Sequence, residues 1–309
     1  MPVARPRCVS SRPAVWAAEE WAVENLKRGA AMKSILFVLS VLILQATSLP
    51  ALAGSVPPQF AVGLGVDAAS GKFGTDSTST YVSVPFILDW FPTERIDLEL
   101  TIPLLYQKSE NTGVAALGAN AKSSARRNMG YTGGSASLAG GGASAGDSEF
   151  GLGDITLTGG YALLQDSDTT PLVRPTLYLK FPTADDTKGL GTGKFDVGPG
   201  VAVSKWLGSW QPFVDSRYIF QGASNEDTGA RDYFIADTGI GYSWNERFYT
   251  SAYARVGSTV FDGMEAPLDI RLKSVWRFAE RLNSEAYLLK GLSDGSPDFG
   301  GGVAIFVEF

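Results

Sequence analysis

Apolar and polar residues alternate through much of this sequence. Between residues 96 and 104 every second residue is aliphatic, and the residues between them include Asp97 and Glu99. The segments 268–278 and 303–309 repeat the pattern. Such alternation predicts β-strands with one apolar face and one polar face. The expected strands, about twelve, cover residues 60–68, 79–91, 94–107, 148–164, 171–183, 193–206, 210–221, 231–244, 248–259, 267–278, 282–292 and 299–309.

The connections between these strands alternate in length. Short connections lie at 92–93, 165–170, 207–209, 245–247 and 279–281, and longer ones rich in Gly, Asp and Ser lie between them. Bacterial outer-membrane barrels have short periplasmic turns, long extracellular loops and an even number of strands of roughly ten residues. We therefore expect an all-β fold, an antiparallel transmembrane β-barrel of about twelve strands, with both of its ends in the periplasm.

The tryptophans of the expected barrel lie beside short connections and never beside a long one. Indole settles at the headgroup level of a bilayer, so aromatic residues at one end of many two-faced strands predict a membrane-interface girdle. The predicted girdle residues are Trp90, Trp206, Trp210, Trp244, Trp276 and Phe309.

The N-terminal region has the features of an export signal. A basic start at Met32-Lys33 precedes an apolar run, and Ala51-Leu52-Ala53 has the small residues of a cleavage site. We expect a signal peptide at 32–53 and an outer-membrane barrel domain at 54–309. Residues 1–31 are interpreted as a misassigned upstream start, or alternatively as an extension of the presequence.

A soluble β-sandwich is the competing fold, because the same alternation would then face a protein core. Three observations favour the membrane barrel: the export signal, the one-sided tryptophans and the aromatic residue Phe309 at the end of the last strand.

The longest expected connection, residues 108–147, consists largely of Gly, Ala and Ser. Such a composition cannot bury a core. Because the segment lacks aliphatic anchors, we interpret it as a flexible, solvated extracellular loop. The alternative is a constriction folded into the mouth of the barrel.

The composition argues against catalysis. The sequence has no histidine, and its single cysteine, Cys8, lies upstream of the expected barrel. The commonest general base and the commonest neutral metal ligand are therefore missing. We expect no enzyme activity, no metal site and no cofactor.

Two further kinds of site were weighed. The glycine-rich segment Gly189-Leu190-Gly191-Thr192-Gly193 is not expected to bind phosphate, because a strand and not a helix follows it. The acidic pairs Asp185-Asp186 and Glu226-Asp227 fit solvated loop tips better than sites that bind calcium or bridge lipopolysaccharide.

Charged residues on the polar face of the strands are expected to line the lumen. The bases between 255 and 277 would form a basic wall that selects polar or anionic solutes. Alternatively, Asp215, Asp237 and Glu285 neutralise those bases across the lumen. By strand parity the lumen-lining residues are Asp97, Glu99, Asp154, Arg174, Lys180, Asp196, Asp215, Arg217, Asp237, Arg255, Asp269, Arg271, Lys273, Arg277 and Glu285.

Four short motifs resemble one known family. Their order and spacing are similar to the bacterial outer-membrane transporter family named after the meta-pathway of phenol degradation, most clearly over residues 148–309, whereas the 108–147 connection is unlike the family pattern. The resemblance implies an outer-membrane channel for hydrophobic or aromatic compounds. From the residues alone, the glycines beside Asp154 and Asp196 are interpreted as packing and bending positions in the wall. The motifs are Gly151-Leu152-Gly153-Asp154, Lys180-Phe181-Pro182-Thr183, Gly189-Leu190-Gly191-Thr192-Gly193 and Asp196-Val197-Gly198-Pro199-Gly200.

These observations predict a monomeric channel in the outer membrane of a Gram-negative bacterium, through which small molecules diffuse passively. The expected partners are outer-membrane lipid and lipopolysaccharide, a small-molecule solute, and periplasmic chaperones and the barrel-assembly machinery during biogenesis, but no nucleic acid. The alternative is a closed barrel with a structural or partner-binding role at the cell surface.

Overall fold

The computed structural model describes residues 59–73, 78–108, 116–119, 136–139, 148–224 and 229–309. The expected signal peptide at 32–53, the segment 1–31 with Cys8, and the acidic pair Glu226-Asp227 lie outside the described residues. No helix in the described part of the chain is long and apolar enough to cross a membrane.

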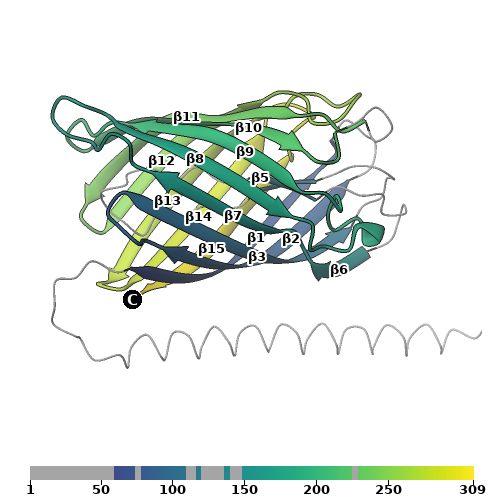
Figure 1. Cartoon of the computed structure of the whole chain (residues 1–309), viewed down its shortest axis with the longest axis horizontal. Helices are drawn as coiled ribbons and strands as arrows, with labels where there is room; N and C mark the ends of the chain where they lie inside the picture. Colours follow the sequence, from purple (N-terminus) through teal and green to yellow (C-terminus); the bar gives the residue numbers. More distant parts are fainter. Residues whose placement is uncertain (1–58, 74–77, 109–115, 120–135, 140–147, 225–228) are drawn as a thin grey trace, which may run out of the picture. The chain divides into compact units, whose positions relative to one another are not determined.

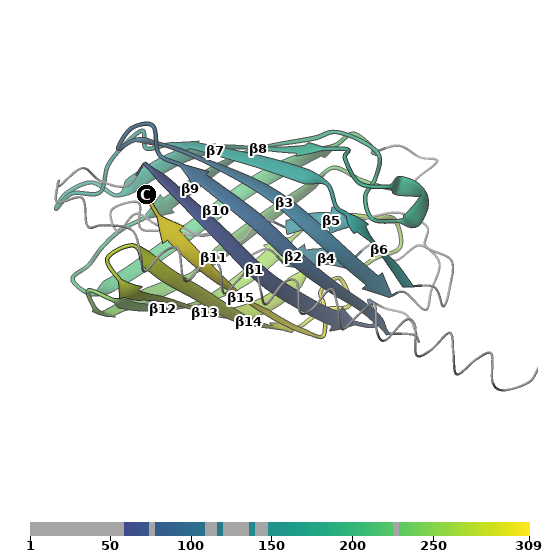
Figure 2. The same ribbon diagram turned by 90° about the horizontal axis from the view of Figure 1, so that it is seen from below.

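Thirteen strands form one antiparallel sheet. Because β2 pairs with both β1 and β3, the sheet closes on itself (Figures 1 and 2). Two short strands, β6 and β7, share one position in the wall beside β3, so the barrel has 12 strand positions and the predicted fold is confirmed. The strands are β1 (Phe60–Gly71), β2 (Ser79–Trp90), β3 (Ile96–Lys108), β6 (Ser148–Leu152), β7 (Ile155–Tyr161), β8 (Leu172–Phe181), β9 (Asp196–Ser204), β10 (Trp210–Gln221), β11 (Tyr233–Asn245), β12 (Phe248–Gly257), β13 (Leu268–Ala279), β14 (Leu282–Gly291) and β15 (Phe299–Glu308).

The interruption between β6 and β7 departs from the continuous strand expected at 148–164. It falls at Gly153 and Asp154, where the Gly153 N–H still donates to the carbonyl of Pro103 at 2.8 Å. A Cβ at Gly153 would lie 2.6 Å from a methyl group of Leu105, so this close approach requires glycine. The break leaves Asp154 buried on the inner side of the wall.

The connection 108–147 contains structure that its composition did not predict. Strands β4 (Ala116–Ala119) and β5 (Ala136–Ala139) pair antiparallel, and β4 lies against β1 and β2. The interpretation as a solvated loop without aliphatic anchors is therefore wrong for this hairpin, in which Leu117 of β4 pairs with Leu138 of β5. Residues 109–115, 120–135 and 140–147 lie outside the described part of the chain.

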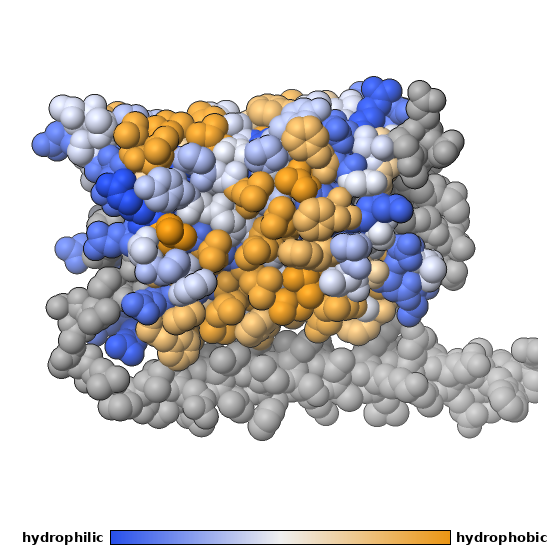
Figure 3. All heavy atoms as spheres, in the orientation of Figure 1, coloured by the Kyte–Doolittle hydropathy of each residue, from blue (hydrophilic) through white to orange (hydrophobic). Residues whose placement is uncertain are grey.

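The outer face of the barrel is apolar across its middle. On one visible face, hydrophobic residues form a band and hydrophilic residues gather toward both ends (Figure 3). Exposed aliphatic side chains such as Ile240, Leu272 and Leu288 belong to the outward positions of the strands. An apolar outer band on a closed barrel is the signature of a protein that spans a membrane.

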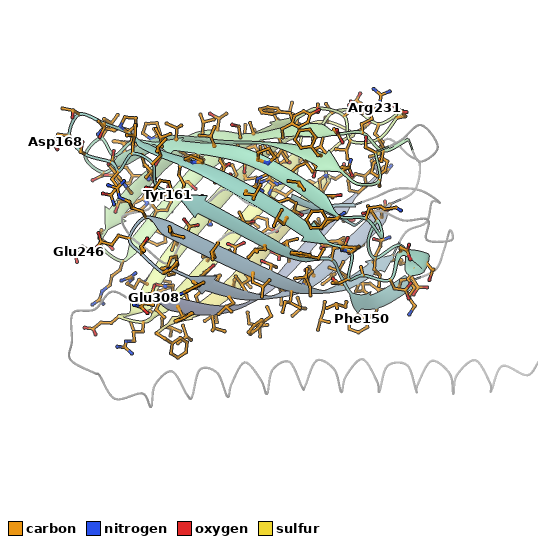
Figure 4. The ribbon with its side chains drawn as sticks, viewed as in Figure 1. Phe150, Tyr161, Asp168, Arg231, Glu246 and Glu308 are labelled. Carbon is orange, nitrogen blue, oxygen red and sulfur yellow. The ribbon has the colours of Figure 1, made fainter. Side chains whose placement is uncertain are left out.

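The two ends of the barrel differ. Glu308, Asp168 and Glu246 lie toward the end that carries the short turns, whereas Phe150 and Arg231 lie toward the end that carries the long loops (Figure 4). We call these the short-turn end and the long-loop end. In bacterial barrels the short turns are periplasmic and the long loops extracellular.

Most of the predicted girdle lies at the short-turn end. Trp90, Trp210, Trp244, Trp276 and Phe309 are exposed, at 42 to 63%. Their rings contact further aromatic side chains; for example, the ring centroids of Trp210 and Tyr242 are 4.6 Å apart. Trp206 differs, because it is half-buried and its ring packs edge-on against Tyr249, 6.1 Å away.

Candidate functional site: the barrel lumen

The residues predicted to line the lumen occupy the inward positions of the strands. Asp97 and Arg277 are half-buried, and every other member of the predicted set is at most 9% exposed. Tyr178, Lys180 and Phe306 are at most 1% exposed, so side chains fill the interior around them. Twelve strands lie between the barrel size that side chains fill and the size that leaves a wide aqueous channel.

Two arginines of the expected basic wall make short ion pairs with neighbouring carboxylates. Arg255 donates from Nε and Nη2 to the two carboxylate oxygens of Asp237 at 2.7 Å each, directly across the β11–β12 pair. Arg271 Nε donates to Oδ1 of Asp269 at 2.5 Å, two residues away on the same strand. Bidentate and charge-assisted bonds of this kind are the strongest polar contacts in proteins.

The other two bases of the wall are also paired. Lys273 Nζ lies 2.8 Å from Oε2 of Glu285, and both side chains are 2% exposed. Arg277 Nη2 lies 3.4 Å from Oε1 of Glu308. The wall is therefore neutralised, as the alternative interpretation held, but mostly by neighbours on the same or the adjacent strand and not across the lumen.

Arg174 is the centre of a second charged group, near the short-turn end. It forms an ion pair with Asp97 through two contacts, of which Nε to Oδ1 measures 2.8 Å. Its charge also interacts with Asp215 and Glu99. A Cβ at Gly160 would collide with the Arg174 guanidinium, so this glycine makes room for the pair. Asp215 thus contributes negative charge around Arg174.

Arg217 has a different environment. Its guanidinium carbon lies 5.3 Å from the ring centroid of Tyr178, a cation–π distance. Its Nε atom has no hydrogen-bond partner among the described residues.

Several inward residues were missed by the sequence reasoning. Asp67 and Asp89 are 4% and 2% exposed and lie on β1 and β2, and Glu308 is 2% exposed on β15. The same parity rule, applied to the first two strands and the last, would have found them. With these residues, carboxylates outnumber bases on the described inner wall. Buried inward tyrosines were missed as well: Tyr81, Tyr178, Tyr233, Tyr253 and Tyr287.

An apolar cluster fills the lumen at the long-loop end. Tyr178, Ile219 and Tyr233 project from the wall and pack around Val260, which belongs to the β12–β13 loop. The backbone N–H of Arg231, in the β10–β11 loop, donates to the carbonyl of Val260 at 2.9 Å. Two long loops are thus joined to each other and to the interior.

The β8–β9 loop, residues 182–195, also enters the barrel. Its Leu190 is 1% exposed and packs against Tyr81 of β2 and Leu105 of β3. A Cβ at Gly151 would lie 2.7 Å from a methyl group of Leu190, so glycine at 151 leaves space for this side chain.

Three of the predicted lumen residues meet at the base of this loop. Lys180 Nζ lies 2.7 Å from Oδ2 of Asp196 and 3.5 Å from Oδ2 of Asp154. The same ammonium donates to Oγ1 of Thr192, in the loop, at 2.7 Å. Lys180 is fully buried, and the ammonium therefore depends on these oxygens for its stabilisation.

The acidic loop residue Asp185 has a structural role. It caps the short 3₁₀ helix η1 (Asp186–Lys188), and its side chain accepts from the Thr187 N–H at 3.1 Å. Hydrogen bonds from Thr187 lower the pKa of the Asp185 carboxyl. Within the described residues no group of three or more acidic, Cys or His side chains could hold a metal ion.

The comparisons with known proteins agree with this geometry. The sequence matches the model of the family described as "MetA-pathway of phenol degradation" over residues 125–309. The chain belongs to this family. The four motifs that carried the resemblance all lie within the matched region, and no curated protein matches the sequence significantly.

Solved structures show the shared fold. The COG4313 outer membrane channel from Pseudomonas putida F1 superposes with a TM-score of 0.56, at 16% identity, over 84% of this chain and 99% of that chain. The KdgM porin gives a TM-score of 0.46 at 6% identity, over 81% and 99% of the two chains. The toluene transporter TodX from Pseudomonas putida gives 0.42 at 10% identity, over 85% and 93%. The phenol-degradation family member described here thus shares the closed barrel fold of the COG4313 channel.

Proposed function

We propose that the chain forms a passive, monomeric channel that lets small solutes cross the outer membrane. The observation that carries the proposal is the closed 12-strand barrel whose inner wall is charged and polar along its length. A barrel with only a structural role could fill its interior with apolar side chains, because buried ion pairs contribute little net stability. We also propose that export removes residues 1–53.

The solute class that fits best is a small aromatic alcohol. The description of the family names phenol degradation, and tyrosines such as Tyr253 and Tyr287 face inward. The pairing of Arg255, Arg271 and Lys273 with carboxylates removes the argument for an anionic solute. The proposed partners are outer-membrane lipid and lipopolysaccharide around the apolar band, and periplasmic chaperones and the barrel-assembly machinery during insertion.

Planar-bilayer recording of the refolded chain Gly54–Phe309 tests this function. We expect discrete current steps, and we expect phenol added at millimolar concentration to reduce the current by occupying the lumen. A variant lacking Gly113–Gly146 separates blockage by that connection from blockage in the barrel. A correctly folded barrel that stays silent in both forms would overturn the channel.

A closed, surface-binding barrel is the second candidate, and one observation favours it. The interior around Lys180, Phe306 and Tyr178 is filled, with at most 1% of each residue exposed. This candidate predicts no current under any condition, including the absence of the loops at the long-loop end.

A further inference from the structure

The β8–β9 loop is where the four family motifs meet. Lys180 ends β8, Asp196 begins β9, and Asp154 lies at the break between β6 and β7. The glycine-rich motif Gly189–Gly193 is the part of the loop that lies on these three residues. The four motifs therefore form one structural unit. It consists of the loop that folds into the lumen and the residues of the wall that bind this loop.

The backbone of the loop is shaped to bring one side chain inward. Gly189 and Gly193 have φ values of 69° and 63°, a left-handed conformation that favours glycine. A Cβ at Gly191 would lie 2.7 Å from both carboxylate oxygens of Asp154, so the chain can approach that carboxylate only with glycine there. Leu190 is held between these positions and packs against Tyr81 and Leu105 on nearby strands of the same side of the wall.

The hydrogen bonds that attach the loop are distinct from the ion pairs among the wall residues. Lys180, Asp154 and Asp196 all belong to the wall, and the ammonium stays between the two carboxylates whether or not the loop is in place. The loop adds the bond from Lys180 to Thr192 at 2.7 Å, the bond from the Ala184 N–H to Oδ1 of Asp154 at 3.1 Å and a backbone hydrogen bond from Thr192 to Asp154. Release of the loop therefore removes hydrogen bonds from this site but leaves Lys180 beside both carboxylates.

The described hydrogen bonds of the loop reach no other long loop, although its Phe195 carbonyl lies close to Gly222 of the β10–β11 loop. The hydrogen bonds found for residues 182–195, in the part of the chain that is described, run within the loop, to its flanking strands and to the segment 153–155 at the β6–β7 break. By contrast, Ser293 Oγ in the β14–β15 loop donates to the carbonyl of Ala266 in the β12–β13 loop at 2.8 Å. Movement of the β8–β9 loop would therefore break no described hydrogen bond to another long loop.

We propose that residues 182–195 are a lid that closes the lumen at the long-loop end. In the closed state the side chain of Leu190 (the stopper) occupies the lumen, and the Lys180–Thr192 hydrogen bond (the latch) holds the loop in place. The proposal rests on the proposed channel function. When the latch releases, Leu190 leaves Tyr81 and Leu105, and the paired residues of the wall remain in place to line the opened passage.

The rate of thiol labelling at the stopper measures lid opening directly. Leu190→Cys is introduced into the chain Gly54–Phe309, which has no other cysteine, and the refolded barrel in lipid vesicles is treated with a membrane-impermeant maleimide. We expect slow labelling, because residue 190 is 1% exposed. Adding Thr192→Val should raise the rate about tenfold, the change expected when a hydrogen bond to a charged group is lost.

Two matched control variants show whether a faster labelling rate comes from the loss of the Lys180–Thr192 hydrogen bond. Thr192→Ser keeps the hydroxyl and should label at the slow rate, and Lys188→Met removes an exposed lysine of the same loop without touching the latch and should do the same. Heat-dependent gel mobility shows that each barrel is folded. Equal labelling rates in the Val and Ser variants would overturn the lid.

Current recordings on the same variants separate this proposal from the channel itself. A Thr192→Val barrel that spends more time in the open state and labels faster supports both. Current steps with unchanged labelling would overturn the lid but not the channel. Faster labelling of a barrel that stays silent would overturn the channel function on which the lid rests.

Discussion

The connections at the two ends of the barrel differ in how far they are buried, although the same strands run to both ends. At the short-turn end the connections at 207–209 and 245–247 are exposed, although Phe91 and Ala162 of neighbouring connections are buried. At the long-loop end Leu190, Val260 and Pro297 belong to connections and are buried. The difference teaches that several long loops pack side chains into the interior at the long-loop end, which is where the proposed channel is expected to be controlled.

Removal of a ring from the apolar cluster should have the largest effect. Tyr178→Ala empties a position that is 1% exposed, and we expect the free energy of unfolding to fall by roughly 3–5 kcal/mol, the usual cost of losing a buried aromatic ring. Urea unfolding in lipid vesicles measures this. Tyr161→Ala, at an exposed position near the short-turn end, is the control and should change the free energy far less. Equal effects would contradict the difference between the ends.

The stability contributed at the two ends of the barrel can also be compared by removing one charged residue at each end. Lys180→Met leaves Asp154 and Asp196 buried without their shared cation and should lower the free energy of unfolding by about 3–5 kcal/mol. Arg277→Met breaks an ion pair at the short-turn end whose arginine side chain is 27% exposed, so solvent screening should limit the loss to about 1 kcal/mol. The urea midpoints of the two variants in the same lipid give the ranking, and a reversed order would contradict it.

The smallest effect is expected on the rim of the long-loop end. Arg231 and Asp262 form an ion pair with side chains 61% and 52% exposed, between two loops. Arg231→Ala should change the free energy of unfolding by no more than about 1 kcal/mol and should leave single-channel currents unchanged. A clear rise in open time would show that the joined loops, and not only the β8–β9 loop, control the passage.

Parity explains why the wall was predictable. Once a strand has an apolar outer face, every second residue must face inward, so positions as far apart as Asp97 and Glu285 can be assigned to the inner face from the alternation alone. The partners were not predictable, because a long side chain can reach along its own strand or to the next. Arg271 pairs within its strand and Arg277 pairs with Glu308, and only the three-dimensional arrangement decides between these routes.

The loops were the least predictable part. The segment Gly189–Gly193 was considered as a phosphate-binding loop and rejected, and nothing in its composition indicated that Leu190 enters the lumen. Its path depends on contacts with β2, β3 and the break at Gly153-Asp154, which are distant in sequence. Trp206 was likewise assigned to the girdle from its position, but it is half-buried and its ring packs edge-on against Tyr249.

The pairing of β1 with β15 has a consequence for assembly. These strands are separated by more than two hundred residues, and their closure joins Phe60 to Phe309 through the Phe309 N–H and the Phe60 carbonyl at 2.8 Å. Until β15 arrives, the backbone donors and acceptors along one edge of β1 have no strand to pair with, which makes that edge a template for aggregation. Because this seam joins the two ends of the barrel sequence, we expect it to form late in folding and to complete the closed barrel.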